Sequence, residues 1–153
     1  MIVGALVFSG HNSGYDYVDR IVRAVVSGSL SFQPVDCRHF KGGFFLHDNI
    51  PCKAEDFYFR NETNDLLVLL SGYIYNREEL CRKFRIHSGL SDPQLIAALY
   101  LQAGPGFVNA LNGDYAIFIL EQKKKLAFLF RDHVGIRPVA FINEGGYSAF
   151  LQI

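Results

Sequence analysis

Residues 66–76 read Leu-Leu-Val-Leu-Leu-Ser-Gly-Tyr-Ile-Tyr-Asn, and this stretch decides the fold. Its first five residues, Leu66 to Leu70, are all apolar, which is typical of a strand covered on both faces. Residues 2–8, near the N-terminus, show the same pattern. A half-exposed sheet would show a cleaner alternation of apolar and polar residues. We therefore expect two sheets packed together and flanked by helices, an α+β architecture.

Apolar residues at helical spacing predict the helices between and before these strands. Asn76 with Glu79 fits an N-cap with its reciprocal partner, so a short helix is expected to follow. Ser91 or Asp92 is expected to cap the next helix, and Pro93 suits its first turn. The apolar stripes are Val18, Ile21, Val22, Val25 and Val26 in the first helix, and Leu95, Ile96, Leu99, Tyr100 and Ala103 in the third.

The C-terminal part of the chain is expected to form a meander. Residues 115–120 and 126–130 predict one hairpin, and residues 139–142 and 147–151 repeat the pattern. Strand-like and turn-rich sequence also follows the first helix. There, Gly42-Gly43 predicts a turn that leads into the next strand.

Length, composition and charge limit the classes of protein to consider. A chain of 153 residues, half of them hydrophobic, predicts one domain with a substantial core. Fifteen basic and fifteen acidic residues give no global field that would attract nucleic acid or an anionic membrane. No apolar run approaches the roughly 20 residues that span a bilayer. We expect a cytoplasmic protein without a nucleic-acid or membrane partner.

Four segments together resemble the class II glutamine amidotransferase domain of the asparagine synthetase family. Residues 71–76 are similar to its Asn-Gly-Glu-Ile-Tyr-Asn segment, and residues 91–100 to the helix that starts with Ser-Asp. Residues 111–116, followed by residues 131–138, resemble its strand pair and its Arg-Asp-x-x-Gly-x-x-Pro turn. The order and spacing make the resemblance specific. It runs from about residue 66 to the C-terminus and is poor over residues 10–64.

The resemblance implies an N-terminal-nucleophile hydrolase fold, a four-layer αββα sandwich of two antiparallel sheets flanked by helices. The family hydrolyses glutamine and passes the ammonia to an ATP-dependent synthetase domain. Its nucleophile is a cysteine directly after the initiator methionine. Here Ile2 occupies that position, and its alkyl side chain has no lone pair with which to attack an amide. The catalytic residue is therefore unknown.

The resemblance also implies substrate-binding positions at Ser71, Gly72 and Asp92. Ser71 stands where the family has the asparagine of its oxyanion pair, whereas Gly72 keeps its place. Asp92 matches the residue that holds the α-ammonium of the substrate, and Arg38 is a candidate for the arginine that binds its carboxylate. Without a ligand, Gly72 simply permits a tight strand-end turn, and Asp92 caps a helix.

Arg131, Asp132, Gly135 and Pro138 are interpreted as a structural motif. Arg131 and Asp132 are expected to support the turn at Gly135 by pairing and capping. Even in the resembled family this motif is largely architectural.

The three cysteines and five histidines predict no further chemistry. Cys37 and Cys52 lack the strand that a hidden N-terminal nucleophile would need after it, and Cys81 is expected in the core. The histidines share no metal-ligand spacing, so neither a metal nor another cofactor is expected.

Three functions remain open from the sequence. The first is a degenerate amidotransferase-like domain (residues 1–153), truncated from a longer asparagine synthetase-type enzyme and lacking glutaminase activity. The second is an active amidotransferase with an unconventional nucleophile, and the third is a free-standing module that binds a small molecule or a protein. Expected partners are glutamine or a related amino acid and the missing C-terminal ATP-dependent synthetase domain, and a homodimer stays open.

Overall fold

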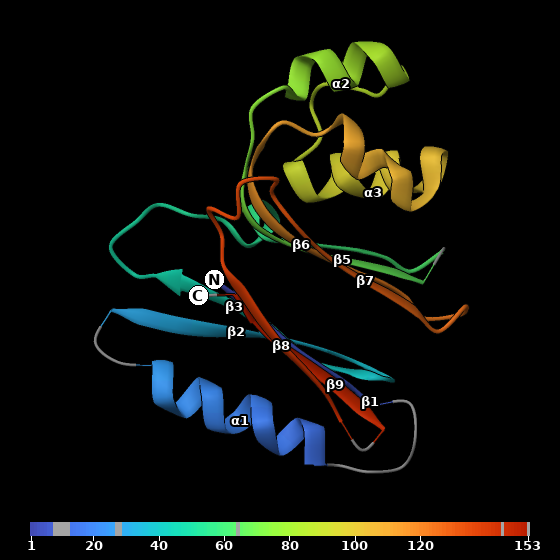
Figure 1. The fold of residues 1–153 in the computed structure, drawn as a ribbon. Coiled ribbons are helices and arrows are strands. Elements are labelled where there is room, and N and C mark those ends of the chain that lie inside the picture. The colour runs from blue at the N-terminus through green and yellow to red at the C-terminus, as the bar shows by residue number, and fades with distance from the viewer. Residues whose placement is uncertain (8–12, 27–28, 64, 145, 153) are drawn as a thin grey trace. The chain divides into compact units, whose positions relative to one another are not determined.

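The computed structural model describes residues 1–7, 13–26, 29–63, 65–144 and 146–152. The chain divides into two compact units, residues 1–52 with 139–153 and residues 53–138. Each unit contains one antiparallel sheet and at least one helix (Figure 1). The expected α+β class with two antiparallel sheets is therefore confirmed.

The first unit is a five-stranded antiparallel sheet in the order β2-β3-β1-β9-β8. Its elements are β1 (Ile2–Val7), α1 (Ser13–Val25), β2 (Leu30–Cys37), β3 (Phe40–His47), β8 (Val139–Glu144) and β9 (Tyr147–Gln152). Helix α1 covers one face of this sheet, where Val18 packs with Val3 and Ala5 (Figure 1). The first predicted strand and helix are confirmed, and residue 8 lies outside the described residues.

Gly42 and Gly43 lie inside β3, so the turn predicted for them is wrong. Gly42 is paired with Gly4 of β1. A Cβ atom at Gly42 would lie 2.5 Å from the Phe40 ring and 2.4 Å from the carbonyl oxygen of Val3. Gly42 is needed because the neighbouring strand and the Phe40 ring approach its backbone too closely for any side chain.

The second unit is a four-stranded antiparallel sheet in the order β4-β5-β6-β7, with α2 and α3 on one side of it (Figure 1). Leu66, Val68 and Leu70 alternate along β5 and pack in one core with Leu95 and Leu99 of α3. The unit consists of η1 (Ala54–Asp56), β4 (Tyr58–Asn61), β5 (Leu66–Ile74), α2 (Arg77–Phe84), α3 (Asp92–Ala103), η2 (Gly104–Ala110), β6 (Gly113–Glu121) and β7 (Leu126–Arg131).

The predicted terminal meander is wrong, although both of its hairpins are present. Strands β6 and β7 belong to the sheet of the second unit, where β6 also pairs with β5. Strands β8 and β9 belong to the sheet of the first unit, where β9 pairs with β1. Residues 132–138 form a loop of their own between the hairpins, so β8 does not turn back onto β7.

Asn76 precedes α2 as predicted, but its side chain does not cap that helix. Its Nδ2 atom donates to the carbonyl oxygen of Ala110 at 2.9 Å, and its Oδ1 atom accepts from the N–H of Asn112 at 2.9 Å. Asn76 is thus the N-cap residue as predicted, but the expected side-chain cap is absent because these backbone groups near the start of β6 take up both ends of the amide. Asn76 thereby ties the end of β5 to the approach of β6.

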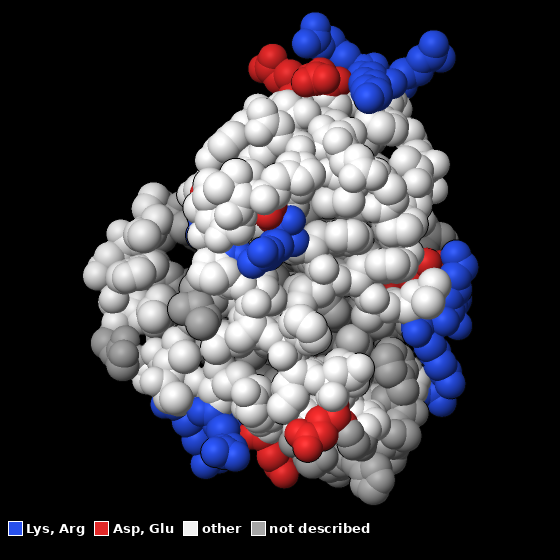
Figure 2. All heavy atoms as spheres, viewed as in Figure 1, with Lys and Arg blue, Asp and Glu red and all other residues white. Residues whose placement is uncertain are grey.

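The described helices include none that is long and apolar enough to cross a membrane. On the face drawn in Figure 2, basic and acidic side chains lie in small groups among a larger uncharged surface. The Lys123–Lys125 run is exposed at the tip of the β6–β7 hairpin, as expected. Cys81 is buried in the core of the second unit, also as expected.

A hydrogen-bonded group of polar side chains lies at the edge of the core of the second unit, beside Tyr100. The hydroxyl of Tyr100 donates to Oε2 of Glu121 at 3.0 Å, and Lys124 lies 2.7 Å from the other carboxylate oxygen. Burial and the hydrogen bond to Glu121 raise the pKa of Tyr100 to about 12. Hydrogen bonding to Lys124, against the opposing effect of burial, lowers the pKa of Glu121 below its ordinary value of 4.5.

Tyr100→Phe is expected to lower the free energy of unfolding at pH 7 by about 1–2 kcal/mol, because a hydrogen bond to a carboxylate is lost. Since the folded state lowers the pKa of Glu121, its contribution is complete above pH 4.5 and is lost as the pH falls through the folded pKa. The raised pKa of Tyr100 makes its contribution complete below pH 10.0, and this is lost as the pH rises through about 12. Urea unfolding of the wild type, Tyr100→Phe and the control Glu62→Gln, from pH 3 to 8, measures how the stability lost in Tyr100→Phe depends on the charge of Glu121. Equal loss at every pH would contradict it.

Candidate functional site

The end of β5 is shaped by a glycine that no other residue can replace without strain. Gly72 has a φ angle of +122° and is paired with Tyr115 of β6. A Cβ atom at this position would lie 1.9 Å from the carbonyl oxygen of Asp114. The backbone alone therefore requires Gly72. Ser71, just before it, is buried.

The backbone after Gly72 is tied to a charged pair. The N–H of Tyr73 donates to Oδ1 of Asp114 at 3.2 Å, and Arg137 donates to Oδ2 of the same carboxylate at 3.2 Å. The two side chains of this ion pair are 30% exposed for Arg137 and 15% exposed for Asp114, so the pair is shielded from water more than a surface pair. Arg137 and Asp114 thus hold the strand end in place.

Asp132 organises the loop from which Arg137 comes. Its Oδ1 atom accepts from the N–H groups of Val134 at 3.1 Å and Ile136 at 2.9 Å, and its Oδ2 atom accepts from that of Arg137 at 3.1 Å. Burial raises the pKa of this carboxyl, but the N–H groups of Ile136, Arg137, Gly135 and Val134 outweigh it and leave the pKa lowered. Asp132 therefore acts as an anionic anchor for the backbone.

The other motif residues serve the same loop. Gly135 has a φ angle of +74°, and its N–H donates to the carbonyl oxygen of Asp132 at 3.1 Å. The Arg131 guanidinium lies over Gly135, 3.3 Å from where a Cβ atom would be. Pro138 ends the loop just before β8. This geometry supports the structural interpretation of the motif.

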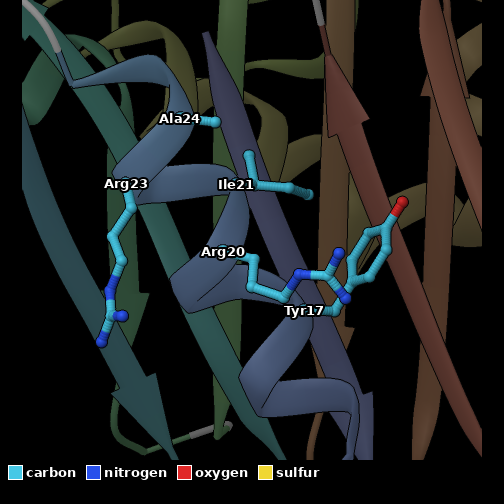
Figure 3. A pocket seen from close by; sticks show the side chains of 5 residues that line it. All are labelled: Tyr17, Arg20, Ile21, Arg23 and Ala24. Carbon is cyan, nitrogen blue, oxygen red and sulfur yellow. The ribbon is translucent and has the colours of Figure 1, made fainter.

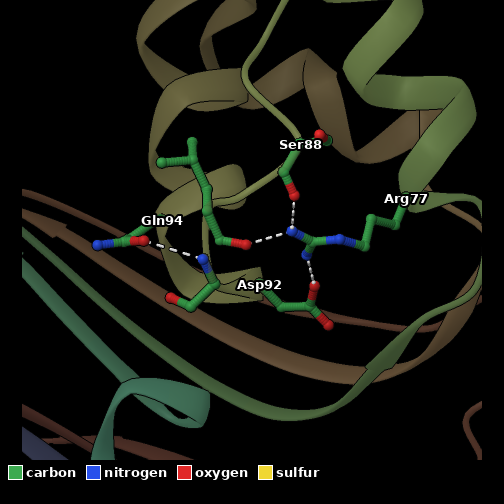
Figure 4. Close-up of polar contacts among 6 residues, drawn as sticks. Arg77, Ser88, Asp92 and Gln94 are labelled. Atoms are coloured by element: carbon green, nitrogen blue, oxygen red, sulfur yellow. Dashed lines mark hydrogen bonds and ion pairs between the residues drawn. The ribbon is translucent and has the colours of Figure 1, made fainter.

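Asp92, the expected ligand of an α-ammonium group, is the first residue of α3 and pairs with Arg77. Figure 4 shows the Arg77 guanidinium between the Asp92 carboxylate and the backbone carbonyl group of Ser88. Arg77 also donates to the carbonyl oxygen of Leu90. The residue that precedes the helix is Ser91, and its N–H donates to Oε1 of Gln94 at 2.9 Å. Asp92 is therefore an ion-pair partner and does not cap the helix.

In the first unit, Ile2 lies at the start of β1 and is paired with Phe44 of β3. The N–H of Phe45 donates to the carbonyl oxygen of Met1 at 3.0 Å, so the first residue already belongs to the sheet. Ile2 is buried, and the residues of β3 next to it, Gly43, Phe44 and Phe45, carry neither a charge nor a nucleophile.

Arg38 is distant from Ile2 along this sheet. It lies in the turn between β2 and β3, where Cys37 is paired with Phe40 and Phe40 with Leu6. Four residues of strand, at about 3.3 Å each, separate this end from Ile2, which is roughly 13 Å. The long side chain of Arg38 can cover part of that distance, so its role toward a substrate carboxylate stays a prediction.

Two cavities have none of the predicted site residues among their lining residues. One of about 620 Å³ is lined by α1 alone, through Tyr17, Arg20, Ile21, Arg23 and Ala24 (Figure 3). The other, of about 520 Å³, is lined by Glu78, Cys81, Arg82, Ile86 and Ser88. Within the described ranges, no group of three or more His, Cys, Asp or Glu side chains could hold a metal ion.

The sequence had given no role to three residues of this region. Asp114 and Arg137 both lie in segments that carry the resemblance, but nothing in either segment shows that they pair. Arg77 directly follows Asn76, and only the fold brings it to Asp92, fifteen residues later. Among the predicted site residues, Gly72 and the motif of residues 131–138 lie around Asp114, whereas Asp92 belongs to the separate contact with Arg77.

Comparison with known proteins gives consistent matches. The family model for "Glutamine amidotransferase domain" matches residues 51–151. "Asparagine synthetase [glutamine-hydrolyzing] 2" of Bacillus subtilis (strain 168) is 37% identical over 87 residues, covering 54% of this chain and 11% of that protein. "Asparagine synthetase [glutamine-hydrolyzing]" of Zea mays is 37% identical over 81 residues, covering 52% of this chain and 14% of that protein. The chain thus spans a small part of the length of these relatives.

The solved structure of glutamine phosphoribosylpyrophosphate amidotransferase from B. subtilis is similar across nearly the whole chain. Its TM-score is 0.61 with 15% sequence identity, and the match covers 97% of this chain and 41% of that one. At this level of identity the likeness shows the fold alone. It confirms the expected fold of the N-terminal-nucleophile hydrolases.

Proposed function

The chain belongs to the glutamine amidotransferase domain family, whose model matches about two thirds of it, and from this membership we propose a specific role. The protein is the amidotransferase-like N-terminal domain of an asparagine synthetase-type, ATP-dependent amide-forming enzyme of the cytoplasm. It has lost glutaminase activity and acts as a scaffold for the synthetase domain. The partner is therefore that ATP-dependent domain, and no cofactor is bound by the amidotransferase-like domain itself.

The observation that carries the proposal is the alkyl side chain of Ile2 at the start of β1. Amide hydrolysis through a covalent intermediate needs a thiol or hydroxyl beside a base. Ile2 supplies neither, and its neighbours in β3, from Gly43 to Phe45, are also without a nucleophile. Removing a single oxyanion donor already lowers such a rate on the order of 10²-fold to 10³-fold, and loss of the nucleophile is more severe.

Two further features support loss of the reaction. Ser71 replaces the asparagine that supplies an oxyanion donor in the resembled family, and a hydroxyl has a shorter reach than an amide. The Asp92 carboxylate is already in contact with Arg77. The features that persist, Gly72 and the loop around Asp132, are those that the backbone itself needs. The pattern is that of a fold kept without its chemistry.

A cysteine elsewhere is the alternative source of a nucleophile. Cys37 is paired with Phe40, four residues along β3 from the partner of Ile2, which is roughly 13 Å. Cys52 is partly exposed, and Cys81 is buried. Cys37 therefore does not stand beside Ile2 in the sheet of the first unit.

Covalent labelling tests the proposal on the intact chain. The protein is incubated with a glutamine analogue that carries an electrophilic ketone, and its intact mass is measured. We expect no added mass on the wild type, whereas Ile2→Cys with Met1 removed is the reference for a chain with the thiol restored. An adduct on wild-type Cys37 or Cys52 that excess glutamine prevents would contradict the proposal and support an unconventional nucleophile.

A further inference from the structure

Arg77 gathers three acceptors at the start of α3. Its Nη1 atom donates to Oδ1 of Asp92, and its Nη2 atom donates to the carbonyl oxygens of Ser88, at 2.9 Å, and Leu90 (Figure 4). The ion pair is largely shielded, since the side chains of Arg77 and Asp92 are 28% and 23% exposed. A planar guanidinium is suited to this geometry, because its donors are fixed in a fork.

This contact changes what Asp92 can recognise. A carboxylate without a bound cation can accept charge-assisted hydrogen bonds from a ligand ammonium group. With Arg77 in place, an incoming ammonium would have to share the carboxylate with another positive charge a few ångströms away. It would also have to lose its water in a partly buried position without gaining a full countercharge. The pair of Arg77 and Asp92 therefore carries no net charge that would attract a cationic ligand.

We propose that Arg77 is a specificity-determining residue that withdraws Asp92 from amino-group recognition, so that the site no longer selects ligands with a free α-ammonium group. The proposal deepens the proposed function and rests on it. It adds that substrate recognition, and not only the nucleophile, has been lost. It also names one side chain that accounts for the loss at Asp92.

The test measures ligand binding and does not depend on hydrolysis. L-glutamine and N-acetyl-L-glutamine, which lacks the ammonium group, are titrated by NMR against the wild type, Arg77→Met, Arg77→Lys and the double variant Arg77→Met/Asp92→Asn. We expect Arg77→Met to bind L-glutamine at least about tenfold more tightly than the wild type, a difference of about 1.4 kcal/mol. We expect no such gain when Arg77→Met is titrated with N-acetyl-L-glutamine. We also expect no gain for L-glutamine in Arg77→Lys, which keeps the positive charge, or in the double variant.

Several results would overturn the proposal. One is that the wild type binds L-glutamine and loses it on Asp92→Asn, because Asp92 would then be a ligand with Arg77 in place. Another is that Arg77→Met folds, by circular dichroism, and gains nothing or gains equally for both ligands. If Arg77→Met does not fold, the same titrations are made with Arg77→Gln, which also removes the positive charge. Failure of both to fold would make Arg77 a requirement of the fold and would refute a role in ligand choice. Ammonia release by the wild type would instead refute the proposed function.

Discussion

Asp132→Ala is expected to lower the free energy of unfolding by roughly 2–4 kcal/mol, because one buried carboxylate serves several backbone donors. The N–H groups of Val134, Ile136 and Arg137 would lose their acceptor together. The ion pair between Arg137 and Asp114 would loosen with the loop, and so would the contact of Asp114 with the N–H of Tyr73. Urea unfolding gives the total loss, and amide hydrogen exchange of residues 134–137 locates it.

The charge of Asp132 gives this prediction a pH dependence. Since the folded state lowers the pKa below the ordinary value of 3.8, the stabilisation is complete above pH 3.8 and is lost as the pH falls through the folded pKa. The difference between the wild type and Asp132→Asn should therefore shrink in acid. His133→Ala, at an exposed neighbour, is the matched control and should change stability by no more than about 0.5 kcal/mol. An equally small effect of Asp132→Ala would show that the loop does not depend on this carboxylate.

Gly72→Ala is expected to destabilise the second unit by roughly 3 kcal/mol or more, from the sum of backbone strain and a steric clash. The φ angle of +122° is unfavourable for any L-residue with a side chain, and the new Cβ atom would lie 1.9 Å from the carbonyl oxygen of Asp114. The hydrogen-bonded partner strand cannot move away without breaking its pairing at Tyr115. Thermal unfolding followed by circular dichroism measures the loss.

Gly106→Ala is the matched control for this prediction. A Cβ atom at Gly106 would meet no other atom within 4 Å, so stability should change by at most about 0.5 kcal/mol. A large loss at Gly72 with little change at Gly106 would establish that Gly72 is held by the backbone. If Gly72→Ala were as stable as the wild type, the strand-end geometry would be contradicted, and a ligand role would be the remaining reason for the glycine.

Local patterns in the sequence were sufficient for the elements of the fold. The apolar run from Leu66 to Leu70 and the matching run after Met1 correctly predicted two buried strands, and each belongs to a different sheet. The helix that starts after Ser91 was predicted from its apolar spacing, and Leu95, Ile96 and Leu99 are buried as expected. Ala103, at the end of the same stripe, is exposed because the helix projects there beyond its core.

The errors concern which segments meet, since local patterns carry little information about distant partners. The hairpins β6–β7 and β8–β9 have the same alternation, and nothing within them shows that they join different sheets. Gly42-Gly43 has the composition of a turn, and only the fold brings the Phe40 ring close to Gly42. The Asn76 side chain accepts from the N–H of Asn112, just before β6, and this distant partner is likewise not visible in the local sequence.

The candidate site was predictable only where the resemblance supplied residues. It correctly indicated the family and the fold. The structural role of the motif from Arg131 to Pro138 stays a prediction, although Asp132 anchors the backbone of that segment. The resemblance could not indicate that Asp92 contacts Arg77, because that contact depends on how the segment 88–92 packs against the start of α2. It offered Arg38 only as a candidate for the carboxylate ligand, because the match over residues 10–64 is poor.

Ammonia release from L-glutamine by the purified wild-type chain is the measurement that tests the central claim most directly. Ile2→Cys is assayed beside it, after mass spectrometry has established that Met1 is removed from the variant. Because Ile2 supplies no nucleophile, the wild type should release ammonia at the rate of a protein-free blank. Release that rises in proportion to the wild-type protein, at a rate comparable with or above that of Ile2→Cys, would contradict the account and require a nucleophile elsewhere in the chain.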